Sequence, residues 1–401
     1  MGKYEIKLPE AVEFIINRLN QKGHRADIVG GPVRDHILGK NPEDYDITTD
    51  ALPEQTKEAF AELRVIETGI KHGTVTLLID GEGYEVTTYR IDGEYKDARH
   101  PERVEFTADI KEDLSRRDFT MNAIAYNHTD GITDPFFGEA DIKAGLIRAV
   151  RDPEKRFSED ALRILRCIRF SSTLGFDIEN GTRIGVFAKK HLLSKVSKER
   201  IYTEWRKLLS GCSALSVFDE YREVIAEFLP EIKDSPLPDG ELFYSSDYQA
   251  RLLSFFSLSG LSGDSFYRAM KRLKTDSSTA EDGRAVLDAQ GKYELDKLSS
   301  VGRLLYDLGE DRSRLLVRLE ILLGKYESDV YRVLDSYISS GKPYLLNGLM
   351  LKGEDVKNMG ISGRNIKAAL EYALFKVIDG ERENEKDALI TLLFSNLSEF
   401  T

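Results

Sequence analysis

The spacing of apolar residues over the first 150 positions changes repeatedly between that of helices and that of strands. Apolar residues every three or four positions predict an amphipathic helix, and short runs rich in Val, Ile and Thr predict strands. In order, the pattern predicts a helix at 9–21, a strand at 26–29, helices at 33–38 and 52–63, and strands at 73–80 and 84–90. The Gly-Glu-Gly sequence at 81–83 predicts a hairpin turn between the last two strands. Residues 1–150 are therefore expected to form a mixed α/β domain with an antiparallel component.

The pattern is less regular towards the end of this domain. Residues 91–111 are strongly charged and lack periodicity, which is typical of a long functional loop. After them the sequence predicts a stretch at 113–122 leading into a helix at 123–126, a turn at 134–138, a short helix, and a strand at 146–150.

From about residue 155 the apolar spacing is helical throughout. Ser158 is expected to cap a helix that carries Glu159 and Asp160 in its first turn and continues to about residue 175. Further helices are predicted after Ser197 and at 216–229, 248–258, 266–273, 313–323 and 366–377, with a linker at 236–240. The expected fold class is therefore α+β: a mixed head at 1–150, a helical neck at 151–210, and a helical body and tail at 211–401.

Composition and charge describe an ordinary globular chain with an uneven charge distribution. The 401 residues are 41% hydrophobic and 31% charged, and the formal net charge is −12. No apolar run has the length of a membrane span, and no secretory signal is expected at the N-terminus. Two cysteines far apart predict reduced thiols and a cytoplasmic location. Residues 141–210 nevertheless hold 16 Lys and Arg against 9 Asp and Glu, an excess of +7 that permits an RNA partner and equally fits a solvated helical face.

One short stretch has the composition of a phosphate and metal site. Gly30 and Gly31 let a phosphate approach the backbone, and Pro32 fits the first helical position. Asp44 and Asp46 follow at i and i+2 of an expected strand, so both carboxylates would point to the same face. Two hard oxygen ligands opposite a phosphate cradle suit Mg²⁺ with a nucleoside triphosphate. A tight turn and two solvated acids are the alternative interpretation.

Several motifs together resemble those of a known family. Val-Gly-Gly-Pro-Val-Arg-Asp at 29–35 and Asp-Tyr-Asp at 44–46 are followed by Arg-Arg-Asp-Phe-Thr-Met-Asn-Ala at 116–123. Glu-Asp-Ala-Leu-Arg-Ile-Leu-Arg-Cys-Ile-Arg-Phe then occupies 159–170. This order resembles the class II tRNA nucleotidyltransferases, the CCA-adding enzymes, to which bacterial poly(A) polymerases are related. Their head is of the polymerase-beta-like nucleotidyltransferase type. The resemblance covers about residues 25–210.

The resemblance implies roles for individual residues. Asp44 and Asp46 would bind Mg²⁺ in a two-ion site, and Glu85 on the following strand is an expected third catalytic acid, with a surface strand acid as the alternative. Asp118 would contact the ribose. The implied nucleotide contacts also include Gly31, Arg34, Arg117, Arg166 and Arg169. Thr120 and Asn122 would support the site.

Asp160 and Arg163 would select the incoming base. At i and i+3 of one helix they could form an ordinary surface ion pair. The resemblance implies instead that they act as a protein template. Cytosine and adenine present an amine beside an unprotonated ring nitrogen, so a carboxylate can accept from the amine and an arginine can donate to the nitrogen. Uracil and guanine reverse both contacts, which would reject them.

The implied activity is template-independent addition of CCA to the tRNA 3′ end from CTP and ATP. Poly(A) polymerase, CC-adding and A-adding activities share the head chemistry and stay open, and a non-catalytic RNA-binding protein is a further alternative. The loop at 91–111 would let the pocket change from C to A. The helical half would bind tRNA through its shape and backbone, with basic segments at 268–274 and 360–367 as phosphate contacts or solvated helix faces. Nothing in the sequence predicts the oligomeric state.

Overall fold

The computed structural model describes residues 6–93, 104–236, 238 and 247–400. The chain forms two compact units, Met1–Pro230 and Glu231–Thr401. The expected linker at 236–240 lies just beyond this boundary, and most of it falls outside the described residues. The divisions expected near residues 150 and 210 both fall inside the first unit and stay predictions.

A mixed seven-stranded sheet forms the centre of the head, with the strand order β3-β4-β5-β2-β1-β8-β9. Its strands are β1 (Ala26–Val29), β2 (Ile47–Thr49), β3 (Arg64–Ile66), β4 (Thr74–Ile79), β5 (Glu82–Thr88), β8 (Ala125–Asn127) and β9 (Gly131–Thr133). Strand β1 is buried and antiparallel to both β2 and β8, whereas β2 and β5 are parallel. The predicted strand at 26–29 and the predicted β4–β5 hairpin are confirmed.

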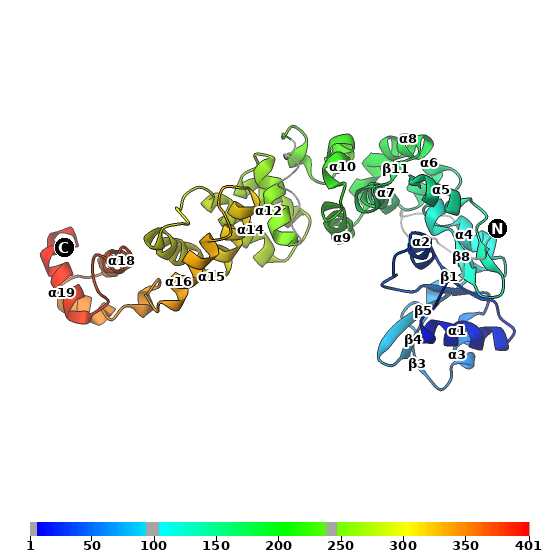
Figure 1. The fold of residues 1–401 in the computed structure, drawn as a ribbon, viewed down its shortest axis with the longest axis horizontal. Helices are drawn as coiled ribbons and strands as arrows, with labels where there is room; N and C mark the ends of the chain where they lie inside the picture. The colour runs from blue at the N-terminus through cyan, green and yellow to red at the C-terminus, as the bar shows by residue number, and fades with distance from the viewer. Residues whose placement is uncertain (1–5, 94–103, 237, 239–246, 401) are drawn as a thin grey trace. The chain divides into compact units, whose positions relative to one another are not determined.

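Short helices pack around this sheet (Figure 1). The helix α1 (Glu10–Gln21) packs on β1 and on α3 (Pro53–Ala59), and its predicted apolar residues are all buried. The helix α2 (Gly31–Ile37) follows β1 directly and packs against it. Pro32 takes its second position, one residue later than predicted. The helices α4 (Ile110–Ser115) and α5 (Gly138–Ala144) complete the head.

Three expectations for the head are wrong. The predicted helix at 123–126 is instead a 3₁₀ turn, η2 (Thr120–Asn122), followed by strand β8, because the short apolar run pairs with β1. The region 91–111 contains paired strands β6 (Arg90–Asp92) and β7 (Val104–Phe106) and the start of α4. The strand predicted at 146–150 is shorter, β10 (Leu146–Ile147), and pairs with β11 (Asp177–Ile178) in the region expected to be wholly helical. The central part of the expected loop, 94–103, lies outside the described residues.

The helix expected to begin at Ser158 is two helices. The first, α6 (Pro153–Glu159), is capped by Asp152, whose carboxylate accepts the Lys155 amide. Asp160 then leaves helical geometry, with φ −137° and ψ 104°. Its carboxylate accepts the Leu162 amide at 3.0 Å and so caps α7 (Leu162–Leu174). The rest of this unit is α8 (Asn180–Lys189), α9 (Lys198–Leu209), α10 (Ala214–Glu220) and α11 (Arg222–Ile225).

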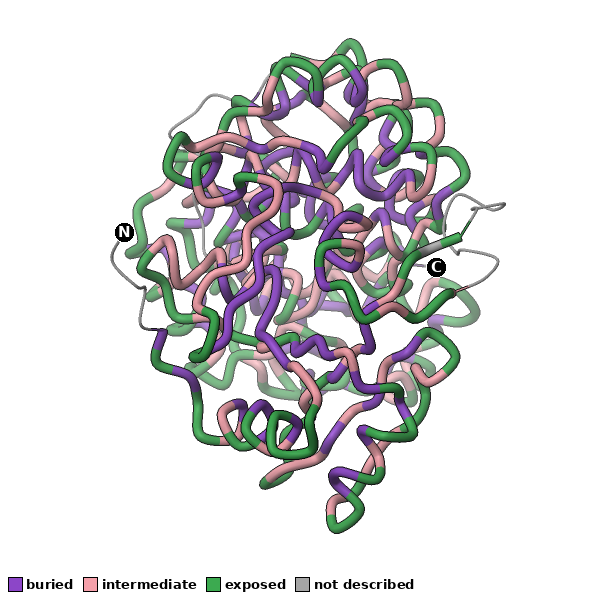
Figure 2. Tube along the Cα trace, turned by 90° about the vertical axis from the view of Figure 1, so that its right-hand side faces the viewer, coloured by how far each residue is buried: buried purple, intermediate pink, exposed green. Residues whose placement is uncertain are grey.

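Buried positions (purple) gather towards the inside of the trace and exposed positions (green) at its edge (Figure 2). The described part of the second unit consists of helices joined by turns and loops. Its helices are α12 (Tyr248–Leu258), α13 (Gly263–Arg272), α14 (Ser277–Ala289), α15 (Leu298–Leu322), α16 (Val330–Ser339), α17 (Gly353–Asn358), α18 (Asn365–Ile378) and α19 (Lys386–Ser395). The helix α15 kinks at Gly309, whose φ is 75°. None of the described helices has both the length and the apolar character of a membrane span.

Candidate active site

Five acidic residues line one cleft of about 720 Å³ between the end of the α2–β2 loop and the start of β5. Three of them are the predicted catalytic acids Asp44, Asp46 and Glu85, the other two are Glu43 and Glu82, and all are exposed. Both aspartates precede β2 rather than lying in it, although the Asp46 carbonyl still accepts the Val29 amide of β1 at 3.0 Å. None of the three carboxylates has a hydrogen-bond or ion-pair partner among the described residues.

The three acids share the cleft without converging on one point. Over the described residues, no group of three His, Cys, Asp or Glu side chains is arranged to hold a metal ion. The structure therefore brings Asp44 and Asp46 together, and Glu85 lies in the same cleft as a separate exposed acid. Its role as a third catalytic acid stays a prediction.

Asp46 has an unfavourable electrostatic position for an anion. Although it is accessible, the surrounding protein removes part of its hydration, and this burial raises the pKa of the carboxyl. The charge of Asp44 adds to the rise in pKa, while Arg117 and Arg166 oppose it. A divalent cation between the two carboxylates would relieve both the lost hydration and the repulsion.

The turn from β1 into α2 places backbone against Arg117. Gly30 has φ 80° and ψ −124°, a conformation that favours glycine. A Cβ on Gly30 would lie 3.1 Å from Nη1 of Arg117, and Gly31 opens α2 directly afterwards. From the first turn of α2, Arg34 donates to Asp35 and, at 2.8 Å, to the side-chain oxygen of Asn122.

Arg117 is poorly satisfied inside the protein. Its nearest acid is Asp113, at 3.5 Å, and its buried Nε has no hydrogen-bond partner in the described part of the chain. Burial lowers the pKa of the guanidinium, an effect that Asp113 and Asp46 oppose without cancelling it. A buried donor without an acceptor is costly unless a ligand supplies one.

Asp118, by contrast, is fully satisfied. Its carboxylate accepts from the Phe119 amide, the Asn122 side chain and, at 2.8 Å, Nε of Arg166, whose Nη2 lies 2.7 Å from the same oxygen as an ion pair. Burial alone would raise the pKa of Asp118, but Arg166 and Asn122 outweigh it and hold that pKa well below the usual range. Asp118 is therefore a permanent anion that ties η2 to α7.

Arg166 and Arg169 meet a second buried acid, Glu204 of α9. Arg169 donates to Glu204 at 2.9 Å, and Arg166 lies 3.8 Å from it. The ring of Phe170 lies beneath three guanidinium groups, with centroid distances of 3.5 Å for Arg169, 5.1 Å for Arg34 and 5.3 Å for Arg166. Helices α2 and α7 thus hold three guanidinium groups around one aromatic ring, and Arg166 among them acts on the charge of Asp46.

Asp160 and Arg163 do not pair with each other. Asp160, at the break between α6 and α7, accepts from Arg200 at 2.9 Å. Arg163 is 9% exposed and donates to Glu159 at 2.9 Å and to the Arg116 carbonyl at 2.8 Å. The alternative of a surface ion pair between Asp160 and Arg163 is wrong, because separate partners orient each side chain.

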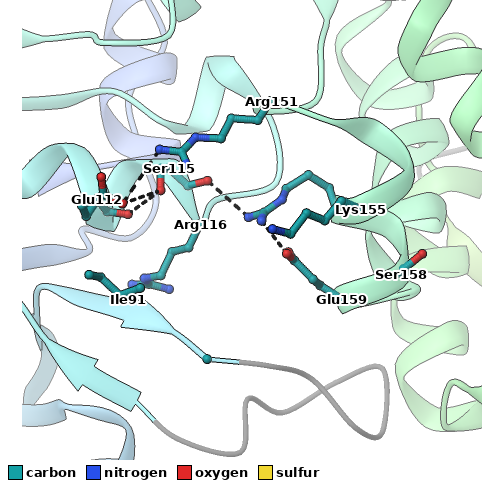
Figure 3. A pocket seen from close by; sticks show the side chains of 10 residues that line it. Ile91, Glu112, Ser115, Arg116, Arg151, Lys155, Ser158 and Glu159 are labelled. Atoms are coloured by element: carbon teal, nitrogen blue, oxygen red, sulfur yellow. Dashed lines mark hydrogen bonds and ion pairs between the residues drawn. The ribbon is translucent and has the colours of Figure 1, made fainter.

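A further pocket of about 590 Å³ lies beside this group, and Figure 3 shows Arg116 and Glu159 among its walls. Glu159 accepts from Arg156 as well as from Arg163, so it links the pocket to Arg163.

The sequence is similar to two family models and to full-length relatives. The family model described as the poly A polymerase head domain matches residues 26–148, and that described as the probable RNA and SrmB-binding site of polymerase A matches 175–235. A CCA-adding enzyme of Lactobacillus delbrueckii subsp. bulgaricus is 35% identical over 388 residues, covering 94% of this chain and 96% of that protein. The CCA-adding enzyme of Levilactobacillus brevis is 34% identical over 394 residues, covering 96% and 98%.

The fold agrees with these relatives. The crystal structure of Bacillus stearothermophilus CCA-adding enzyme in complex with CTP covers 98% of this chain and 99% of its own, with a TM-score of 0.79 and 30% identity. The chain belongs to the CCA-adding enzyme family. It is a nucleotidyltransferase, and the α+β fold expected from the sequence is confirmed.

In this CCA-adding enzyme family member, sequence motifs alone did not find every residue that shapes the site. Glu204 and Arg200 lie on α9, outside the quoted motifs, and are seen only because α9 packs on α7. Glu159 does stand inside a quoted motif, next to Asp160. Only the structure shows that Glu159 accepts from Arg163 and so orients its guanidinium.

Proposed function

We propose that this enzyme adds CMP, CMP and AMP to the 3′ end of tRNA, using CTP and ATP and no nucleic-acid template. Full-length relatives named CCA-adding enzymes and a 30% identical structure with CTP support the proposal. The observation that carries it is the arrangement at Asp46: this unpaired carboxylate, repelled by Asp44, lies in the field of Arg117, which has an unsatisfied buried Nε, and of Arg166. A nucleoside triphosphate with a divalent cation satisfies all of these groups together. We place the reaction in the cytoplasm.

The reaction is a displacement at the α-phosphorus of the nucleotide. The tRNA 3′-oxygen forms a bond to that phosphorus and passes its proton to water, and the bond between the α-phosphorus and the oxygen that bridges it to the β-phosphate breaks, which releases pyrophosphate. Asp44 and Asp46 would hold Mg²⁺, since hard, unpaired carboxylates with repelling charges fit this ion. When bound, Mg²⁺ lowers the pKa of an attacking hydroxyl and neutralises charge on the leaving group.

The residues around the carboxylates would bind the nucleotide. Arg117 would donate its free Nε–H to the triphosphate, and the Cβ-free turn at Gly30 and Gly31 leaves room for phosphate oxygens. Arg166, held by Asp118, would add a fixed positive charge. Arg34 and Arg169 are held near the same Phe170 ring and would extend the cationic surface.

Base selection would rest on Asp160 and Arg163. Asp160 retains acceptor capacity beside its bonds from Leu162 and Arg200, so it can accept from the amine of cytosine or adenine. The Arg163 guanidinium is oriented by Glu159 and by the Arg116 carbonyl and retains Nε–H for a ring nitrogen. These oriented groups would select cytosine and adenine, because uracil or guanine would leave the Asp160 carboxylate and the Arg163 Nε–H without partners.

The related activities are outcomes of the same assay. A poly(A) polymerase would append a run of A to any primer, and a CC-adding or A-adding enzyme would stop after part of the sequence. The loop thought to permit the change from C to A lies partly outside the described residues. The basic segments at 268–274 and 360–367 stay predicted tRNA contacts, although Arg272 is already paired with Glu231.

The catalytic assignment is tested with Asp44→Asn and a matched control. The variant is expected to lose CMP incorporation by at least ~100-fold while its tRNA affinity is retained, because it loses a metal ligand. Glu43→Gln changes a neighbouring exposed acid of the same cleft and is expected to keep activity. Equal incorporation by wild type and Asp44→Asn would refute the assignment. A wild type that binds tRNA but never incorporates nucleotide would instead be a non-catalytic RNA-binding protein.

A further inference from the structure

The segment that carries the two aspartates has few attachments to the rest of the head. This carboxylate loop, residues 40–46, joins α2 to β2. At its start the Lys40 amide donates to the Asp35 carbonyl at 2.8 Å, and at its end the Asp46 carbonyl accepts from Val29. Between these two points, within the part of the chain that is described, Tyr45 is the one loop residue with a hydrogen bond.

That bond joins Tyr45 to His36 in the last turn of α2. The Tyr45 hydroxyl and Nε2 of His36 are 3.0 Å apart, and the two rings lie 6.0 Å apart at 48°. Both side chains are half-buried. In the tautomer that leaves Nε2 unprotonated, the imidazole accepts at that nitrogen and the Tyr45 hydroxyl donates to it.

Tyr45 stands between Asp44 and Asp46 in the chain, and its side chain reaches back to the helix that begins at Gly31. We propose that the His36–Tyr45 hydrogen bond fixes the position of the two carboxylates relative to α2, which makes His36 and Tyr45 positioning residues for nucleotidyl transfer. The inference rests on the proposed function. The bond sets the separation between the carboxylates and the phosphate-facing turn, and a misplacement of about 1 Å at a reacting centre costs on the order of 100-fold in rate.

The alternative is a bond that only stabilises the folded head. In that case its loss would lower the unfolding midpoint and leave catalysis by the folded enzyme unchanged. A positioning bond instead changes kcat and cation affinity, and leaves the KM for CTP nearly unchanged, because Arg117 and Arg166 do not depend on the loop. A stabilising role would therefore change the unfolding midpoint, whereas a positioning role would change kcat and cation affinity.

The test uses Tyr45→Phe, His36→Leu and the double variant in the full chain. Tyr45→Phe removes one oxygen and keeps the ring, and Tyr84→Phe is the matched control: its hydroxyl, in the same cleft, bonds to Glu82 at 3.0 Å. Three quantities are measured: kcat and KM for CMP incorporation, the Mg²⁺ concentration for half-maximal activity, and Mn²⁺ affinity by electron paramagnetic resonance without nucleotide.

Each single variant is expected to lower kcat by about tenfold or more, to weaken Mn²⁺ binding, and to change the KM for CTP by less than about twofold. The double variant is expected to lose no more than either single one, because one shared bond is removed. His36→Gln, which can still accept from the hydroxyl, is expected to recover part of kcat.

Unchanged kcat and Mn²⁺ affinity in both single variants, or fully additive losses in the double variant, would overturn the inference. Failure of the proposed function can be distinguished from failure of this inference, because the wild type would then incorporate no nucleotide at all. Weaker Mn²⁺ binding in the variants would still support the positioning role in that case.

Discussion

Asp118→Asn tests the charge network that ties the head to α7. The substitution keeps the shape of the side chain and removes the charge that pairs with Arg166, whose Nε donates at 2.8 Å and whose Nη2 lies 2.7 Å away. Removing one partner of a fully buried ion pair costs about 3–5 kcal/mol. Arg166 is 33% exposed and keeps Glu204 at 3.8 Å, so solvent and the second acid reduce the loss. We expect the free energy of unfolding to fall by about 2 kcal/mol.

The pH dependence of this loss follows from the direction of the pKa shift. The pKa of Asp118 is lower in the folded protein than in the unfolded chain, where it is about 3.9. Its contribution to stability is therefore complete above about pH 5, and it is lost as the pH falls below 4 towards the folded value. The difference between wild type and variant should be constant from pH 5 to 8 and shrink in acid.

Urea unfolding followed by tryptophan fluorescence is the assay. Trp205 is the single tryptophan of the chain and is buried on α9, which packs on the helix that carries Arg166. Asp152→Asn is the control, because asparagine caps a helix about as well as aspartate. Equal unfolding midpoints for wild type and Asp118→Asn between pH 5 and 8 would refute the reasoning.

Four further substitutions have outcomes set by single features of the structure. Asp160→Ala should raise incorporation of UMP and GMP at least ~10-fold relative to CMP and AMP, and strict rejection of UTP and GTP would contradict the template role. Gly30→Ala, strained at φ 80° and brought 3.1 Å from Arg117, should lower kcat/KM for CTP about 10-fold or more. Gly39→Ala, at φ 71° with open space around it, is the control and should cost about 1 kcal/mol of stability and no activity. An equal loss of activity in Gly30→Ala and Gly39→Ala would show a general backbone effect. Phe137→Asn should stabilise the head by about 0.5–1 kcal/mol in urea unfolding, because a 77% exposed phenylalanine there has φ 61°, and a lower midpoint would contradict this.

The spacing of apolar residues correctly predicted those helices and strands whose formation depends mainly on their own sequence. The strand at Ala26–Val29 and the helix at Tyr248–Leu258 appear where the spacing and composition predict them. The four-residue run at 123–126 is too short for its period to distinguish helix from strand, and pairing with β1 decides it. The helix break at Asp160 was missed because Pro153 starts α6 earlier than Ser158 would.

The sequence predicts which residues belong to the site, but it does not predict the contacts between them. Motifs place Asp44, Asp46 and Arg117 in order along the chain, and the fold brings Arg117 near enough to Asp46 to oppose the rise in its pKa. The partners that orient the site come from distant positions: Arg166 is 48 residues from Asp118, and Arg34 is 88 residues from Asn122. No local pattern encodes such pairs, because tertiary packing alone brings them together.

The most direct measurement is the sequence of the product made from tRNA that ends before CCA, with all four nucleoside triphosphates and Mg²⁺ present. The wild-type enzyme is predicted to add C, C and A in that order and then stop. A run of A, a product that contains U or G, or no extension at all would contradict template-independent CCA addition by this protein.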